Sequence, residues 1–260
     1  MTRPNRLHPS SPHSFQRSLP SYHAASTAQA QIADALVQAL QWSGAPTRFA
    51  RVFEFGCGTG HLTSHLLHQF SITHLGLNDL LPGCAATLQP ILHRYAATAT
   101  FSPGAIETLD LPTGLNLIAS ASTVQWVDDP ASLLARLADH LAPGGWLALS
   151  GFGTGHFAEL RQLGGLGKAP SYLDPADWQR ILPSNLQILA LQSQPIVLQF
   201  PDALSLLRHL RLTGVNAPAS RIWTRADLAA FEARLRQGLP KHSDLTLTYC
   251  PVILIARKSL

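Results

Sequence analysis

Charged residues are scarce in this sequence, and it contains no hydrophobic run long enough to cross a membrane. Asp, Glu, Lys and Arg together make up 13% of the 260 residues, while apolar residues make up 46%. This balance is typical of a globular chain with a sizeable core. No run of 18 apolar residues occurs, so the sequence predicts no transmembrane helix. The basic N-terminus is not followed by an apolar segment, which argues against a secretory signal peptide.

Cysteine is also rare, and its distribution excludes a disulfide framework. The three cysteines, Cys57, Cys84 and Cys250, are odd in number and far apart, which is typical of buried free thiols in a reducing compartment. We therefore expect a cytoplasmic protein. The same spacing argues against a cysteine metal site, and His61 and His65 would supply two ligands on one helical face with no third nearby. We expect no bound metal and a half-solvated histidine face.

Dense runs of lysine or arginine are missing, although the formal net charge is +4. The basic residues gather late in the chain. A modest basic surface of this kind suits an acidic protein partner as well as a phosphate backbone, and a plain solvated surface explains it equally. The basic residues in question are Arg208, Arg211, Arg221, Arg225, Arg234, Arg236 and Lys241.

Strands and helices alternate through the N-terminal part of the chain, after a segment rich in Pro, Ser and His. We expect residues 1–23 to form a flexible segment or lid, and residues 24–260 to form a single domain. The periodicity predicts strands at 51–55, 73–78, 99–102, 115–119 and 146–151, and helices at 24–42, 60–69, 82–95 and 130–141. This alternation indicates a doubly wound α/β sheet with helices on both faces.

The C-terminal part is less regular. It predicts helices near 156–163, 174–182, 202–213 and 225–237, and strands within 186–200 and 245–257. Placing both late strands beside the strand at 146–151 gives a mostly parallel, seven-stranded sheet of the Rossmann-like type. We expect the segment at 201–240 to form a helical cap over the carboxyl ends of the strands, where such sheets bind ligands.

A glycine-rich loop after the first predicted strand carries the strongest functional signal. Glu54 is followed by Gly56, Gly58 and Gly60 at alternate positions, just before a helix. Glycine lets the backbone approach a ligand closely, and the free N–H groups of a helix start favour polar ligands. A dinucleotide fold would need its third glycine where His61 stands, and a P-loop would need Gly-Lys-Ser/Thr, so neither is indicated.

The acid before this loop points to a cationic ligand. Glu54 would repel a pyrophosphate, whereas it suits a charged amine. Acid–apolar–Gly–x–Gly–x–Gly resembles motif I of the class I methyltransferases, which bind S-adenosylmethionine. A bare glycine turn after a strand is the alternative interpretation.

Two later loops supply candidate positions for the same ligand. Asp79 follows the second strand, about 20 residues after the glycine loop, which is the spacing of an acid that accepts from ribose hydroxyls. An Asn-Asp turn is the alternative. Beyond the third strand, the main-chain N–H and apolar side chain of Ile106 are candidates for contact with adenine, and a loop without a role fits the local sequence equally.

The loop after the fourth strand, residues 120–126, lacks the acceptor box of many amino-group methyltransferases. That box, Asn/Asp-Pro-Pro-aromatic, supports a neutral nitrogen nucleophile and is absent here. A carboxylate has a pKa of about 4 and is already ionised at neutral pH, so it needs position and alignment but no general base. The loop is compatible with O-methylation of an acid, and we expect Trp126 to lie near the substrate.

Several separate segments together resemble one family, the malonyl-acyl-carrier-protein O-methyltransferases of early biotin synthesis. The similarity runs over about residues 14–258. It is most specific in Val124-Gln125-Trp126 and in the late pattern Leu-Thr-Tyr at 247–249 with Ile-Ala-Arg at 255–257. The other matching segments are 14–17, 21–22, 54–60, 78–80, 104–107 and 224–225. The glycine loop alone marks only the superfamily.

The resemblance implies methyl transfer from S-adenosylmethionine to the free carboxylate of a malonyl group on an acidic acyl carrier protein, or on CoA, with release of S-adenosylhomocysteine. The ester masks a charge that the apolar tunnels of fatty-acid enzymes would otherwise have to desolvate. The candidate cofactor-binding residues are Glu54, Gly56, Cys57, Gly58, Gly60, Asp79, Leu80, Ala105, Ile106 and Ser120, and the candidate substrate-binding residues are Gln125, Trp126, Arg161 and Arg17.

A carboxylate that enters a closed site needs a donor partner, because its desolvation would otherwise oppose binding. Arg161, one helix past the strand at 146–151, is the candidate, since an arginine can grip one oxygen while the other attacks. A solvated or paired Arg161 is the alternative, and Arg17 in the N-terminal lid comes next. Trp126 and Tyr22 are further positioning candidates, and we assign no residue as a certain catalytic group.

The chain departs from the family pattern at Ala105, where relatives carry an Asp that accepts from the adenine amino group. The lost hydrogen bond costs about 1 kcal/mol, and it leaves open a relative that binds S-adenosylmethionine without transfer. A methyltransferase of another small carboxylic acid, such as a trans-aconitate-like diacid, is the other alternative. A nucleic-acid methyltransferase is disfavoured by the missing acceptor box. We expect a monomer with neither a nucleic-acid nor a membrane partner.

Overall fold

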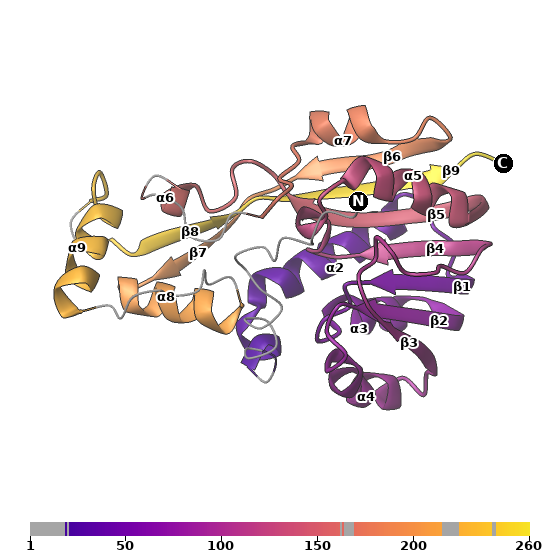
Figure 1. Cartoon of the computed structure of the whole chain (residues 1–260), viewed down its shortest axis with the longest axis horizontal. Helices are drawn as coiled ribbons and strands as arrows, with labels where there is room; N and C mark the ends of the chain where they lie inside the picture. The colour runs from indigo at the N-terminus through magenta and orange to yellow at the C-terminus, as the bar shows by residue number, and fades with distance from the viewer. Residues whose placement is uncertain (1–18, 20, 162, 164–168, 215–223, 241–242) are drawn as a thin grey trace, which may run out of the picture.

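One seven-stranded sheet forms the centre of the molecule (Figure 1). The structure, a computed structural model, describes residues 19, 21–161, 163, 169–214, 224–240 and 243–260. The strand order is β3-β2-β1-β4-β5-β9-β6; β1 to β5 run parallel, and β9 is antiparallel to both of its neighbours. The strands are β1 (Arg48–Phe55), β2 (Ser71–Asp79), β3 (Ala99–Pro103), β4 (Leu115–Ser120), β5 (Leu141–Phe152), β6 (Leu186–Ser193) and β9 (Pro251–Lys258). The predicted mostly parallel α/β sheet is confirmed.

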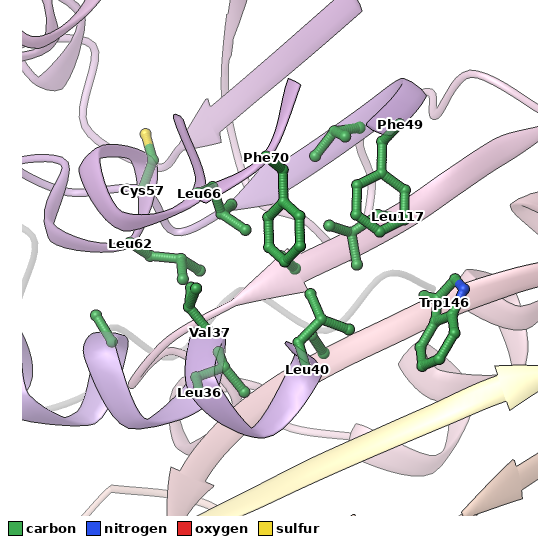
Figure 2. Close-up of a cluster of buried hydrophobic side chains, with 14 of the residues drawn as sticks. Leu36, Val37, Leu40, Phe49, Cys57, Leu62, Leu66, Phe70, Leu117 and Trp146 are labelled. Atoms are coloured by element: carbon green, nitrogen blue, oxygen red, sulfur yellow. The ribbon is translucent and has the colours of Figure 1, made fainter. Parts of the chain in front are cut away.

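Helices cover both faces of the sheet, as predicted. On one face lie α2 (Thr27–Trp42), α3 (His61–Gln69) and α4 (Cys84–Arg94), and on the other lie α5 (Pro130–His140) and α7 (Pro175–Ile181). Figure 2 shows the apolar cluster of the first face, to which Leu36 and Leu40 of α2 and Leu117 of the sheet belong. None of the helices described has the length and apolar character needed to cross a bilayer.

Side-chain alternation in β1 decides which residue faces which layer. Phe53 and Phe55 belong to the cluster beneath α5, whereas Val52 belongs to the cluster beneath α3. Because successive side chains of a strand point to opposite faces, Glu54 shares the face of Val52. The side chain of Glu54 is thereby directed toward α3, where the hydroxyl of Thr63 donates to it.

A second unit follows β6 in the chain. It consists of β7 (Ile196–Phe200), α8 (Ala203–Leu212), α9 (Arg225–Leu235) and β8 (Leu245–Tyr249), which we call the cap. Its core is a third apolar cluster, built around Leu206, Phe231 and Leu247 and closed by Ile32 of α2. Figure 1 shows the cap beyond the carboxyl ends of the parallel strands.

The predicted pairing of the late strands was wrong in part. β9 lies beside β5 as expected, but β6 pairs with β9 and not with β5, and β7 and β8 form a separate two-stranded sheet. Pro195 lies between β6 and β7, and Pro251 opens β9. Proline cannot donate to a ladder, so each of the two apolar runs divides into two strands at or near its proline. The helix predicted near 156–163 is the four-residue α6 (Ala158–Arg161).

Candidate active site

The three glycines after β1 all adopt left-handed backbone angles, with φ of +63° at Gly56, +52° at Gly58 and +87° at Gly60. Residues with a Cβ pay a steric penalty in this region. A Cβ at Gly56 would lie 2.1 Å from Oγ1 of Thr123, and one at Gly60 would lie 2.4 Å from Cδ1 of Ile91. A Cβ at Gly58 would meet nothing within 4 Å among the atoms described. Gly58 is therefore the glycine whose Cα borders open space.

Glu54 is buried beneath this loop and bound to α3. Its Oε2 accepts a 2.8 Å hydrogen bond from the hydroxyl of Thr63. Burial raises the pKa of Glu54 to about 8, and the negative charge of Asp79 adds to the shift. A cationic group beside Glu54 would reverse this shift by favouring its ionised form. The site thus holds a carboxyl group that gains from a positively charged ligand.

Asp79 connects the loops that follow β1 and β2. Its Oδ2 accepts from the backbone N–H of Gly58 at 2.9 Å, and its Oδ1 accepts from the N–H of Leu81 at 2.9 Å. Each carboxylate oxygen has a further lone pair for a ligand hydroxyl. The neighbouring Asn78 donates to the carbonyls of Ser102 and Gly104, so its amide is committed to the loop after β3. Asp79, and not Asn78, fits the ribose-binding prediction.

The other cofactor candidates hold strand ends together. The buried Ser120 donates to the carbonyl of Phe55 at 2.7 Å, and the N–H of Cys57 donates to the carbonyl of Asn78 at 3.0 Å. Ile106 is buried in the cluster beneath α5, and Arg136 donates to its carbonyl at 2.6 Å. The remaining two candidates differ in exposure, since Leu80 is 52% exposed and Ala105 is half-buried.

A cavity of about 40 Å³ lies beyond the ends of β4 and β5, against the cap. Tyr22, Gln125 and Trp126 line it, so three of the predicted positioning and substrate residues share one space. Gln125 is buried, and its Nε2 donates to the carbonyl of Ser122 at 2.6 Å. The rest of the lining is formed by Gln29, Ser122, Phe152, His156, Ala169, Tyr172, Thr213 and Tyr249.

Tyr22 lies at the junction of this cavity with the glycine-loop side of the site. Burial raises the pKa of its phenol, with smaller contributions from Asp79 and Cys84. Burial likewise raises the pKa of Tyr249, and the ionised form of Tyr22 would add to that shift. Tyr22 is thus close both to the acid at the end of β2 and to the cap side of the cavity.

Sequence reasoning missed His156, which is 5% exposed and stacks between two aromatic rings. Its ring centroid lies 3.9 Å from that of Phe152 and 3.8 Å from that of Phe157. Burial, with a smaller effect from the charge of Arg161, lowers the pKa of His156 to about 3. The only signal in the sequence was a histidine soon after a predicted strand end, in the stretch Gly-Thr-Gly-His.

The two predicted arginines are not part of the described cavity. Arg161 is exposed at the end of α6, and its charge acts on the pKa of two lining residues, His156 and Tyr172. Arg17 lies outside the described residues. The part of the cavity lining that the structure describes contains neither Arg nor Lys. The described lining residues therefore offer a ligand neutral donors and acceptors.

The segment before α2 packs against the glycine loop. Nδ1 of His23 lies 3.1 Å from the hydroxyl of Thr59, and the hydroxyl of Ser26 lies 2.9 Å from Nε2 of His61. The two histidine rings stack at 4.2 Å. His65 lies 3.5 Å from Asp34. Within the described ranges, no group of three His, Cys, Asp or Glu residues is arranged to hold a metal ion.

Comparison with known proteins gives a consistent result. A family described as a methyltransferase domain matches residues 24–215. The malonyl-[acyl-carrier protein] O-methyltransferase of Chlorobium luteolum is 34% identical over 246 residues, which cover 94% of this chain and 93% of that protein. The protein of the same name from Acinetobacter baylyi is 34% identical over 252 residues, covering 94% of each.

Solved structures share the fold. The N-methyltransferase NodS from Bradyrhizobium japonicum, in complex with S-adenosyl-L-homocysteine, superposes with a TM-score of 0.55 at 14% identity and covers 95% of this chain and 97% of that one. At this identity the likeness concerns the fold alone. Together with the relatives at 34% identity along nearly their whole length, it shows that the chain belongs to the malonyl-[acyl-carrier protein] O-methyltransferase family, within the class I methyltransferase fold.

Proposed function

We propose that the protein transfers a methyl group from S-adenosylmethionine to the free carboxylate of a malonyl group carried by an acyl carrier protein. The products are a malonyl methyl ester, the starting unit of pimeloyl synthesis for biotin, and S-adenosylhomocysteine. The observation that carries the proposal is the adjacency of two sites. The loops after β1 and β2 suit a nucleoside with a charged amine, and Tyr22, which lines the cavity after β4 and β5, lies close enough to Asp79 for that charge to raise its pKa.

On the cofactor side, each proposed contact follows from one observed group. Asp79, fixed by the N–H groups of Gly58 and Leu81, accepts from the ribose hydroxyls. Glu54 lies beneath the loop and stabilises the positive end of the cofactor electrostatically. The absent Cβ of Gly58 leaves room for the ligand above the loop. Ile106 contributes its backbone and apolar surface next to adenine, where Ala105 offers no carboxylate.

The reaction requires no catalytic base. The malonyl carboxylate is ionised at neutral pH, and one of its oxygens attacks the methyl carbon in line with the departing sulfur. A C–O bond forms while the C–S bond breaks, and the electron pair of that bond returns to sulfur. A sulfonium cation and a carboxylate anion thereby become a neutral thioether and a neutral ester. A cavity that excludes water favours this loss of charge, because it withdraws solvation from the charged reactants more than from the neutral products.

The cap supplies a surface for the acidic carrier protein. Arg208, Arg211 and Arg225 are exposed on α8 and α9. Complementary charge accelerates the encounter of two proteins and fixes their orientation. The names of the relatives specify the same carrier-bound substrate. A small free diacid would not need such a surface, so dependence on the carrier separates the proposal from its main alternative.

Incubation with S-adenosylmethionine and malonyl-carrier protein, followed by intact mass measurement, tests the proposal. We expect a gain of one methyl group on malonyl-carrier protein and little product from free malonate or trans-aconitate. Malonyl-CoA in a parallel reaction gives the preference between the two carriers. Efficient methylation of a free diacid would transfer the assignment to the small-acid alternative. Cofactor binding without any turnover would identify a non-catalytic relative.

A further inference from the structure

The cavity after β4 and β5 contains an unusual number of unsatisfied polar atoms. In the described part of the chain, four buried side-chain atoms have no hydrogen-bond partner: Gln29 Oε1, Ser122 Oγ, Gln125 Oε1 and Trp178 Nε1. The first three belong to residues that line this cavity. Buried polar groups in folded proteins are nearly always paired, so their concentration at one place marks a polar site, in which the hydroxyl of Ser122 is the unpaired group that can donate to an anion.

The backbone at this cavity is strained as well. Ser122 has a φ of +57°, and Phe157, which stacks on the lining residue His156, has a φ of +52°, although neither is glycine. The conformation of Ser122 is held from β5, because its N–H donates to the hydroxyl of Ser150 at 3.0 Å. Such strain costs about 1–3 kcal/mol per residue, and it persists where surrounding structure enforces it, as in binding and catalytic sites. Ser122 thus lines the cavity in a backbone conformation that is unfavourable for a residue with a Cβ.

The tautomer of His156 is fixed by its neighbour. The backbone N–H of Cys250 donates to Nδ1 of His156 at 3.4 Å, so this nitrogen is the acceptor. The proton of the neutral ring therefore lies on Nε2. The aromatic sandwich of Phe152 and Phe157 keeps the ring neutral by excluding water. His156 thus brings a neutral N–H donor to a cavity whose described lining holds no Arg or Lys.

We propose that the Nε2–H of His156 and the hydroxyl of Ser122 bind the reactive carboxylate of the malonyl group and present it to the methyl donor. This assignment rests on the proposed function. Both donors are neutral and buried, and they come from the two strand ends that meet at the cavity. The amide oxygens of Gln29 and Gln125 are acceptors, so they repel a carboxylate and confine it to the side of His156 and Ser122.

Neutral donors suit this reaction better than an arginine would. The carboxylate loses its negative charge as the ester forms, so a full positive charge beside it would stabilise the substrate more than the transition state. Interactions that favour the ground state raise the barrier to the chemical step. Hydrogen bonds from neutral groups offset the desolvation of the carboxylate with a smaller penalty of this kind. The ester carbonyl still accepts from one donor, while the weaker bond helps product release.

Three variants and one control test the assignment. His156→Phe keeps an aromatic ring in the stack but removes the donor, and His156→Gln returns an N–H near the position of Nε2. Ser122→Gly removes the hydroxyl and also relieves the left-handed backbone. His93→Gln, at an exposed histidine of α4, is the matched control. Steady-state kinetics with malonyl-carrier protein, calorimetric binding of S-adenosylhomocysteine and thermal unfolding are measured for each.

We expect His156→Phe and Ser122→Gly each to raise the KM for malonyl-carrier protein about tenfold or more, equivalent to about 1.4 kcal/mol. The Kd for S-adenosylhomocysteine should stay within about twofold of wild type, and His156→Gln should recover part of the loss. Inhibition by the methyl-ester product should weaken less than binding of malonyl-carrier protein, because the product has no charged oxygen. A merely structural role would affect both ligands alike.

The possible outcomes distinguish a failure of the proposed function from a failure of the carboxylate site. If the wild-type protein does not methylate malonyl-carrier protein, the proposed function itself is wrong. If the wild type is active and His156→Phe keeps the wild-type KM, only the carboxylate site is overturned. If His156→Phe does not fold, Ser122→Gly decides, and its unchanged KM overturns the site. Equal weakening of malonyl-carrier protein and its methyl ester would also overturn it.

Discussion

Replacing Gly56 and Gly58 separately by alanine should give two different defects. The backbone of both residues is left-handed, which costs a residue with a Cβ about 1–2 kcal/mol. At Gly56 the new Cβ would also lie 2.1 Å from Oγ1, 2.5 Å from Cγ2 and 2.8 Å from Cβ of Thr123. Overpacking of this kind adds about 1–3 kcal/mol. At Gly58 no atom in the described structure lies within 4 Å of the new Cβ.

The two defects are separable by measurement. In thermal unfolding, the free energy of unfolding should fall by about 2–5 kcal/mol for Gly56→Ala and by about 1–2 kcal/mol for Gly58→Ala. At about 2–4 °C per kcal/mol for a protein of this size, Tm should fall by about 4–20 °C and about 2–8 °C, respectively. Calorimetric binding of S-adenosylhomocysteine should instead be weakened more in Gly58→Ala than in Gly56→Ala. The folded Gly58→Ala variant should lose S-adenosylhomocysteine affinity about tenfold or more, because its Cβ enters the proposed ligand space.

A double-mutant cycle with Thr123→Gly isolates the steric part. If the clash with Thr123 is real, Thr123→Gly should offset about 1–3 kcal/mol of the Gly56→Ala defect, as a coupling energy. The same change combined with Gly58→Ala should show no coupling, because that Cβ does not approach Thr123. Absence of coupling at Gly56, or equal ligand affinity in Gly58→Ala and wild type, would refute the roles assigned to these glycines.

Three further predictions concern charged groups. Asp79→Asn should weaken S-adenosylhomocysteine binding by about 1.5–3 kcal/mol, and equal affinity in a titration would contradict its ribose role. Arg161→Ala should raise the KM for malonyl-carrier protein modestly and leave turnover of a small malonyl thioester unchanged, because Arg161 is exposed and outside the described cavity lining. A strong loss of activity with both substrates would identify Arg161 as the carboxylate partner. The pKa of Glu54 rises from 4.5 to about 8 on folding, so between these pH values the native state retains a proton that the unfolded state releases. The free energy of unfolding should therefore fall as pH rises from about 4.5 to about 8, by up to about 1.4 kcal/mol per pH unit. Glu54→Gln should remove this contribution, and denaturant unfolding with an unchanged pH dependence would exclude it.

Much of the fold could be predicted from local sequence signals. The helix predicted at 130–141 is α5, and Asp129 caps its start by accepting from the N–H of Ser132. The alternation of strands and helices predicted the mostly parallel sheet, which the structure confirms. The pairing of β7 with β8 could not be predicted, because an apolar run does not encode its partner strand.

The candidate site divides in the same way. The glycine loop and Asp79 have a fixed spacing along the chain, so pattern reasoning finds them. His156 has no such spacing, because its environment is assembled from β5, from the segment around α6 and from the start of β9. Its stacking and its fixed tautomer exist only in three dimensions. Arg161 was chosen because its charge is visible in the sequence, whereas the exposure of its side chain is not.

The cap leaves the sheet and returns to it at a single place. Ser193 of β6 and Val252 of β9 are paired residues on neighbouring strands, and Ile196 and Tyr249 are paired across the first step of the cap. The intervening segment is thus a graft whose two ends are already adjacent, so exchanging or resizing it adds little loop-closure cost. The glycine loop lies outside the exchanged segment, although Ile32 of α2 and Phe152 of β5 pack against the cap core. Replacing this one continuous segment would therefore change the two cavity-lining residues that it carries, Thr213 and Tyr249, while Ser122 and His156 stay in place.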